Sequence, residues 1–402
     1  MSGLAEYPIV DGDGHVMEPD DLWLERMDKK RWGDWIPYRT MVDGRYETTF
    51  VGGQVRGGGK EFIEELCAKT GITPEQYHEM LAGLRVAGGH DPVARLADMD
   101  RDGIDAAVLY ASQALFFGPV SPIESLRDVE FVHACQRAYN AWIAEYCQAD
   151  PRRLFAMGAV PLQDIDRAVE EVERCINGLG HKGVFIRPSA YIDELPLNHP
   201  VYDRFWAACQ DLDAAVAFHP GSYADTPGAC KFFRLVSDSP NIMASSMAMD
   251  EIHGGAALGQ AVGNTVDMIV TMGRIVMGGV CERFPRLRFL FLEAGGGWIP
   301  TQVERMDEQV KAFPLERRWL SMLPSEYFAR QCYAGFEAEE WNLAASAEFL
   351  GTDRVIWASD YPHPEFHPDV VKELLKGIAP LAEPDQARVA GGNAVEAYKL
   401  DI

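Results

Sequence analysis

Eight short apolar segments, separated by longer stretches with helical periodicity, constrain the fold of this 402-residue chain most strongly. Each segment is rich in β-branched or aromatic residues and ends near Gly, Pro, Ser or Asp, which is typical of buried parallel strands. The segments are residues 7–14, 103–112, 153–162, 182–188, 213–221, 287–297, 329–336 and 354–362. The apolar spacing between them predicts helices within 125–149, 164–179, 200–212 and 297–312. Eight repeats of strand and helix predict an α/β fold, and the count favours a (β/α)8 TIM barrel over a doubly wound open sheet.

Two stretches depart from this repeat. Residues 27–90 follow the first strand and contain an alternating, Gly-rich segment that predicts a β-hairpin. Residues 220–257 follow the fifth strand, and we interpret them as a lid-like insertion, because long insertions in a barrel commonly carry function. Both insertions start from the same rim of the barrel. No linker separates a second domain, so residues 1–402 are predicted to form a single barrel domain.

Charge and composition exclude several classes of partner. The formal net charge is −24, which disfavours binding to nucleic acids or to anionic membrane surfaces. The start of the sequence does not resemble a secretory signal, and no apolar run approaches the length of about 18 residues that a membrane span needs. The eight cysteines form no C-x-x-C pair, so we interpret them as reduced core residues of a cytoplasmic protein. A small-molecule substrate is the expected partner, and a homodimer is the default assembly.

Five residues that can bind metals fall at the predicted carboxyl ends of strands, which is where barrels carry their active sites. They are Asp13, His15, His219, Glu293 and Asp360. Each alone has a simpler explanation, such as a turn aspartate, a loop histidine, a helix cap or a partner for a buried arginine. Their convergence on one rim predicts a site for a divalent metal, Zn, Mn or Fe. We expect Asp360, Glu293 and His219 to take part in catalysis as well.

Three further residues near the strand ends are candidates for substrate binding. Arg187 follows the fourth strand and can bind a substrate carboxylate with its planar guanidinium, although a structural ion pair would explain it equally well. Tyr361 and His363 follow the eighth strand and would line the pocket.

The chain resembles the amidohydrolase-related family that includes aminocarboxymuconate-semialdehyde decarboxylase and the resorcylate-type decarboxylases. The resemblance is carried by DGDGHVMEPDDLW, LADMDRDGIDAAVLYAS, GHKGVFIRP, FHPG, ERFPRLRFLFLEAGGGWIP, SDYPHPE and GGNAVEAY, which span almost the whole sequence. It implies a metal-dependent barrel in which Asp13, His15, His219 and Asp360 match the family's ligand positions. Many members carry a histidine at the end of the sixth strand, where this chain has Glu293.

These observations favour a metal-dependent hydrolase or C–C lyase, decarboxylase-like, acting on a small organic acid, ester or thioester with an apolar body. Glu293 would be a general acid or base, or would orient a ligand. Two alternatives stay open. Three carboxylates with two imidazoles would also suit a non-haem iron oxygenase, including one with a dinuclear iron site. A barrel that binds without catalysis is the other.

Overall fold

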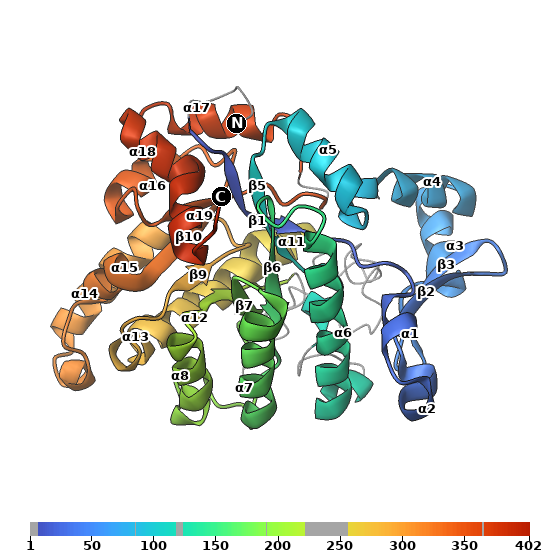
Figure 1. Cartoon of the computed structure of the whole chain (residues 1–402), viewed down its shortest axis with the longest axis horizontal. Coiled ribbons are helices and arrows are strands. Elements are labelled where there is room, and N and C mark those ends of the chain that lie inside the picture. The colour runs from blue at the N-terminus through green and yellow to red at the C-terminus, as the bar shows by residue number, and fades with distance from the viewer. Residues whose placement is uncertain (1–6, 85, 118–123, 190, 222–255, 364–365) are drawn as a thin grey trace.

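Eight parallel strands form the centre of the molecule, with helices around them (Figure 1). The computed structural model describes residues 7–402 apart from 85, 118–123, 190, 222–255 and 364–365. The strands are β1 (Val10–His15), β5 (Ala106–Tyr110), β6 (Leu154–Ala159), β7 (Gly183–Ile186), β8 (Ala215–Phe218), β9 (Phe289–Phe291), β10 (Cys332–Glu337) and β11 (Val355–Ala358). Neighbouring strands pair in chain order, and β11 lies beside β1. The predicted (β/α)8 barrel is therefore confirmed.

The helices pack their apolar faces on the strands. They include α5 (Pro92–Asp102), α6 (Val129–Cys147), α7 (Ile165–Glu173), α8 (Asp203–Asp211), α12 (Thr265–Val276), α14 (Ile299–Ala312), α16 (Leu343–Leu350), α17 (Val370–Ile378) and α19 (Asn393–Tyr398). Asp91, Asp128 and Asp164 start the first three, because their carboxylates accept hydrogen bonds from backbone N–H groups of the first turn. Among the described residues, no helix has the length and apolar character needed to cross a bilayer.

One predicted strand begins too early. Residues 329–331 belong to helix α15 (Pro324–Gln331), and strand β10 starts only at Cys332. Pro324 occupies the first turn, where a missing N–H costs nothing, and the helix buries Tyr327 and Phe328. The same strand extends one residue further than predicted and ends at Glu337. This extension adds a carboxyl group to the rim.

The segment between β1 and α5 contains a small sheet and several helices. Strands β2 (Tyr38–Val42), β3 (Tyr46–Val51) and β4 (Gln54–Gly58) pair antiparallel, so the predicted hairpin region holds three strands. Helices α1 (Leu22–Arg26), α2 (Lys29–Trp32), α3 (Lys60–Thr70) and α4 (Pro74–Leu84) complete the segment. Tyr46, Phe62, Ile63, Leu66 and Tyr77 form a separate apolar cluster there. Strand β3 and helices α3 and α4, which carry these residues, lie to one side of the barrel (Figure 1). The predicted lid at 220–257 lies almost wholly outside the described residues.

The seam between β1 and β11 is held by the side chain of Asp11. This carboxylate accepts hydrogen bonds from the Ser359 backbone N–H at 3.0 Å and from the Ser359 hydroxyl at 2.6 Å. Arg95 from α5 lies 3.7 Å from the same carboxylate and donates to the backbone oxygen of His15. Strand β1 carries one extra residue between Asp11 and Gly14 relative to β5. Such a bulge redirects side chains, and here Asp11 faces the seam while His15 faces the barrel interior.

Gly12 allows the two strands of this seam to approach each other. A Cβ atom at Gly12 would lie 2.1 Å from Cγ2 of Ile356 on β11. We expect Gly12→Ala to destabilise the fold by about 1–3 kcal/mol, because the strands cannot separate without breaking the seam. Chemical denaturation measures this change. Gly273→Ala is the control, since a Cβ there meets no atom within 4 Å and a helical alanine stabilises by about 1 kcal/mol. Equal effects of the two substitutions would contradict the close-approach explanation.

Two buried histidines predict a loss of stability in mild acid. Burial lowers the pKa of His133 and of His181 from 6.5 to about 4 in the folded protein. The unfolded chain therefore takes up these protons first, and folding becomes less favourable as the pH falls from about 6.5 towards 4. In that window the wild type should lose about 1 kcal/mol per pH unit more than His181→Gln. Urea denaturation near pH 7 and near pH 5 measures the difference, and parallel losses would refute it.

Candidate metal centre

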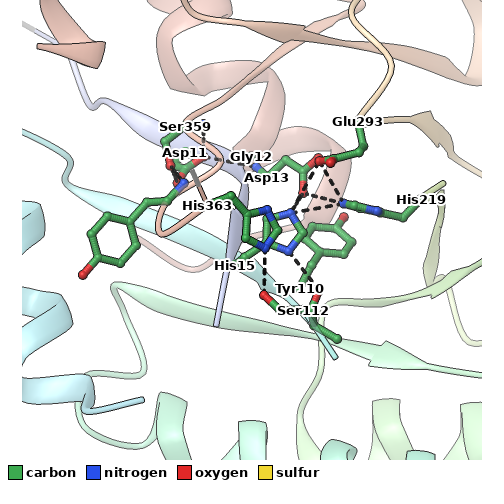
Figure 2. A network of polar contacts seen from close by, with 12 residues as sticks. Asp11, Gly12, Asp13, His15, Tyr110, Ser112, His219, Glu293, Ser359 and His363 are labelled. Atoms are coloured by element: carbon green, nitrogen blue, oxygen red, sulfur yellow. Dashed lines mark hydrogen bonds and ion pairs between the residues drawn. The ribbon is translucent and has the colours of Figure 1, made fainter. Parts of the chain in front are cut away.

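Four side chains from three strand ends meet inside the barrel mouth. Asp13 and His15 come from β1, His219 follows β8, and Glu293 follows β9. One ligand atom from each lies within 4.8 Å of the others. His219 Nε2 lies 3.5 Å from Asp13 Oδ1, 3.6 Å from Glu293 Oε2 and 3.3 Å from His15 Nε2. Figure 2 shows these four groups pointing toward one another.

Backbone carbonyls fix the orientation of both histidines. His15 Nδ1 lies 2.9 Å from the oxygen of Ala111, and His219 Nδ1 lies 3.0 Å from the oxygen of Pro220. A carbonyl can only accept, so each Nδ1 carries the hydrogen in this arrangement. Each Nε2 then presents a lone pair to the centre of the cluster. Metal-binding histidines are usually held in this way by a second hydrogen bond.

The carboxylate oxygens at the centre fit a cation. Among the described residues, neither oxygen of Asp13 nor Oε2 of Glu293 has a hydrogen-bond partner, although all three atoms are buried. Burial of unsatisfied charge is costly unless a counter-charge compensates it. Two carboxylates neutralise one divalent cation, and carboxylates with imidazoles are ordinary ligands of zinc, manganese and iron. The residues present therefore fit a divalent metal.

The electrostatics of the cluster agree with this assignment. Burial acts to raise the pKa of Glu293, but the neighbouring His15 and His219 outweigh it and lower that pKa to about 2. Burial acts to lower the pKa of His219, but Asp13 and Glu293 raise it above its ordinary value. The carboxylate of Glu293 is thus ionised and able to bind a cation.

Asp360 does not join these four residues within 4.8 Å and is paired with Glu337 instead. Burial raises the pKa of both carboxyl groups, that of Glu337 to about 8. The negative charges of Glu293 and Asp13 raise both further, whereas the contact with Asp360 lowers the pKa of Glu337. At neutral pH the protonated form of Glu337 is therefore favoured, and burial disfavours the charged form of Asp360 as well. Oδ1 of Asp360 has no hydrogen-bond partner among the described residues. Glu337 was not predicted from the sequence, although an acidic residue directly after the seventh apolar segment was the available signal.

The loop after β9 is clamped so that Glu293 keeps its position. Glu293 has a φ of +56°, and its backbone oxygen accepts from Asn264 Nδ2 at 3.0 Å. Glu340 accepts from the backbone N–H groups of Gly296 at 2.8 Å and Gly297 at 3.0 Å. A Cβ at Gly296 would lie 2.2 Å from the ring of Phe336, so only glycine fits there.

The three residues predicted to bind substrate lie in different surroundings. His363 stacks on His15 with ring centroids 4.0 Å apart. Arg187 is nearly buried, donates to the Leu115 oxygen at 3.1 Å and lies over the ring of Phe116. The Tyr361 hydroxyl donates to Asp98, and Arg95 lies over its ring, so this side chain supports the seam and does not face the metal ligands.

Comparisons with known proteins agree with the fold and identify the family. The amidohydrolase family model matches residues 10–400. Gamma-resorcylate decarboxylase of Rhizobium sp. is 24% identical over 84% of this chain and 95% of its own. An amidohydrolase structure from Mycobacterium avium subsp. paratuberculosis has a TM-score of 0.72 at 22% identity, covering 99% of both chains. A 5-carboxyvanillate decarboxylase structure from Novosphingobium aromaticivorans, with manganese and a nitrobenzoic acid bound, has a TM-score of 0.63 at 20% identity, covering 99% of this chain and 97% of its own. This chain is an enzyme of the expected metal-dependent hydrolase or C–C lyase class, and it belongs to the amidohydrolase family.

Proposed function

We propose that this enzyme is a metal-dependent decarboxylase that removes CO2 from a small aromatic carboxylic acid. The observation that carries the proposal is the pairing of two features at one barrel mouth. Asp13, His15, His219 and Glu293 converge with unsatisfied carboxylate oxygens, and a proton-sharing carboxyl pair lies beside them. Decarboxylation needs both a cation for the substrate's anionic groups and a proton donor for the carbon that loses CO2. The names of the relatives support the choice of an aromatic acid.

The chemistry divides between the metal and the chain's own residues. A bound divalent metal would supply Lewis-acid polarisation of the substrate's oxygens. The Glu337–Asp360 pair holds the proton that replaces CO2. The bond between the ring carbon and the carboxyl carbon breaks, its electron pair stays on the ring carbon, and the proton of the carboxyl pair forms the new C–H bond. Solvent then returns a proton to the carboxyl pair. Overall, the aromatic carboxylate and one proton give CO2 and the same ring with a hydrogen in place of the carboxyl group.

Arg187 is our candidate for binding a second anionic group of the substrate. Its guanidinium is held by the Leu115 oxygen and by the ring of Phe116, 5.2 Å away, which leaves its orientation little freedom. A planar guanidinium binds carboxylates through two parallel hydrogen bonds. The candidate metal is manganese first, then zinc or iron. A cytoplasmic location and a homodimer stay predictions.

Metal binding tests the ligand set. Asp13→Asn keeps the size of the side chain but removes a charged ligand. We expect metal affinity to fall at least about 100-fold, since loss of a group that merely orients a ligand already costs up to that much. Elemental analysis after purification without chelator measures the ion and its stoichiometry. Glu339→Gln is the matched control, because Glu339 is half exposed and pairs with His367. Full metal content in Asp13→Asn would exclude this site, and nearly two irons per chain would favour the oxygenase.

Proton delivery tests the reaction. With 2,6-dihydroxybenzoate and 5-carboxyvanillate as substrates, the wild type loaded with Mn²⁺ should release CO2 and, in D2O, place deuterium on the carbon that lost it. Asp360→Asn and Glu337→Gln should each lower kcat about 10²–10⁴-fold, the usual contribution of a general acid. Release of CO2 is followed by a coupled bicarbonate assay and deuterium by NMR. Undiminished turnover in both variants would remove the carboxyl pair from the mechanism.

A further inference from the structure

His363 lies beside the metal ligands without belonging to them. Its ring stacks on that of His15, with centroids 4.0 Å apart and an angle of 29° between the planes. It is not among the four residues whose ligand atoms lie within 4.8 Å of one another. The ring therefore covers one side of the site. The nitrogen that carries the ring hydrogen, Nδ1 or Nε2, determines which of the two can accept a hydrogen bond.

Ser112 determines the position of that hydrogen. The Ser112 hydroxyl oxygen lies 2.7 Å from the backbone oxygen of Val16 and 2.8 Å from Nε2 of His363. A carbonyl oxygen only accepts, and a hydroxyl has one hydrogen, so Ser112 donates to Val16. The serine oxygen must then accept from His363, which places the hydrogen on Nε2. In a neutral imidazole this leaves Nδ1 with a bare lone pair.

That lone pair faces the site. Ala111 and Ser112 are consecutive, and they anchor His15 through Nδ1 and His363 through Nε2, respectively. The two nitrogens of an imidazole point to nearly opposite sides of the ring. Nδ1 of His363 therefore points to the same side as Nε2 of His15, toward Glu293 (Figure 2). Within the described residues Nδ1 makes no hydrogen bond, and it is not among the fully buried polar atoms without a partner.

We propose that His363 is a specificity-determining residue whose Nδ1 accepts a hydrogen bond from a hydroxyl group of the substrate. This hydroxyl group is next to the substrate's own carboxylate, which faces the metal ligands. This inference rests on the proposed function and narrows its substrate to a hydroxylated carboxylic acid. A bare nitrogen attracts a hydroxyl hydrogen and repels a carboxylate or ether oxygen. The site thereby selects for a donor at this position, because an analogue without the hydrogen leaves the acceptor unpaired.

Stacking on His15, with ring centroids 4.0 Å apart, and the contact with Ser112 hold the His363 ring in this orientation. Ser112 is a positioning residue in this arrangement, since it acts only through His363.

Binding of matched ligands tests the inference without depending on turnover. Metal-loaded protein is titrated by calorimetry with 2,6-dihydroxybenzoate and with 2,6-difluorobenzoate, which has no hydrogen to donate. The wild type should bind the dihydroxy acid at least about tenfold more tightly. His363→Phe keeps a ring over His15 and should lose that preference at unchanged metal content. His363→Asn, which retains an acceptor oxygen near the position of Nδ1, should keep most of it, and Ser112→Ala should weaken it.

His367→Phe is the control, because it makes the same substitution at a partly exposed histidine that faces Glu339. It should bind both acids as the wild type does. The inference is overturned if the wild type shows no preference, if His363→Phe retains it, or if His363→Phe loses its metal. If the preference vanishes in His363→Phe while no acid is decarboxylated, the acceptor role stands and the decarboxylase assignment fails. If acids are decarboxylated while His363→Phe keeps the preference, the decarboxylase assignment stands and the acceptor role fails.

Discussion

Four carboxyl groups gathered at one end of the barrel impose the constraint on which the site depends. Asp13, Glu293, Glu337 and Asp360 come from four different strand ends, and each raises the cost of ionising its neighbours. The protein can compensate this negative charge with a bound cation or with a proton. The structure divides the four between them. Asp13 and Glu293 lie with two imidazoles whose lone pairs face inward, whereas burial and neighbouring charges raise the pKa of Glu337 and of Asp360.

The seam of the barrel serves this arrangement. Asp11 bridges β1 to Ser359 at the end of β11, and Arg95 compensates the charge that this bridge buries. Because Asp13 lies two residues beyond Asp11 and Asp360 directly follows Ser359, the seam fixes both carboxyl groups at once. The backbone N–H of Asp360 even reaches the oxygen of Asp13, at 3.3 Å. A change at Asp11 would therefore act on the positions of both Asp13 and Asp360.

Strand ends are predictable from this sequence, but the partners of the side chains are not. Topology alone brings Asp13, His15, His219 and Glu293 together, since parallel strands of a barrel end on one rim. The sequence could not place Glu337 beside Asp360, because the predicted strand stopped one residue short of Glu337. The other end of that strand was also misplaced, because residues 329–331 belong to helix α15. Histidine tautomers were equally hidden, since distant carbonyl and hydroxyl groups decide them.

Backbone conformation supports the same division of roles. Glu293 and Asp360 both have positive φ, +56° and +53°, in the left-handed region that favours glycine. A non-glycine residue there costs roughly 1–2 kcal/mol, and such strain persists where surrounding contacts impose it. Asn264 and Glu340 hold the first turn, and the seam holds the second. Glycine would relieve the strain at either position but would remove the carboxyl group. The fold therefore accepts strain at two carboxyl groups, one that meets the candidate metal ligands and one that lies against Glu337.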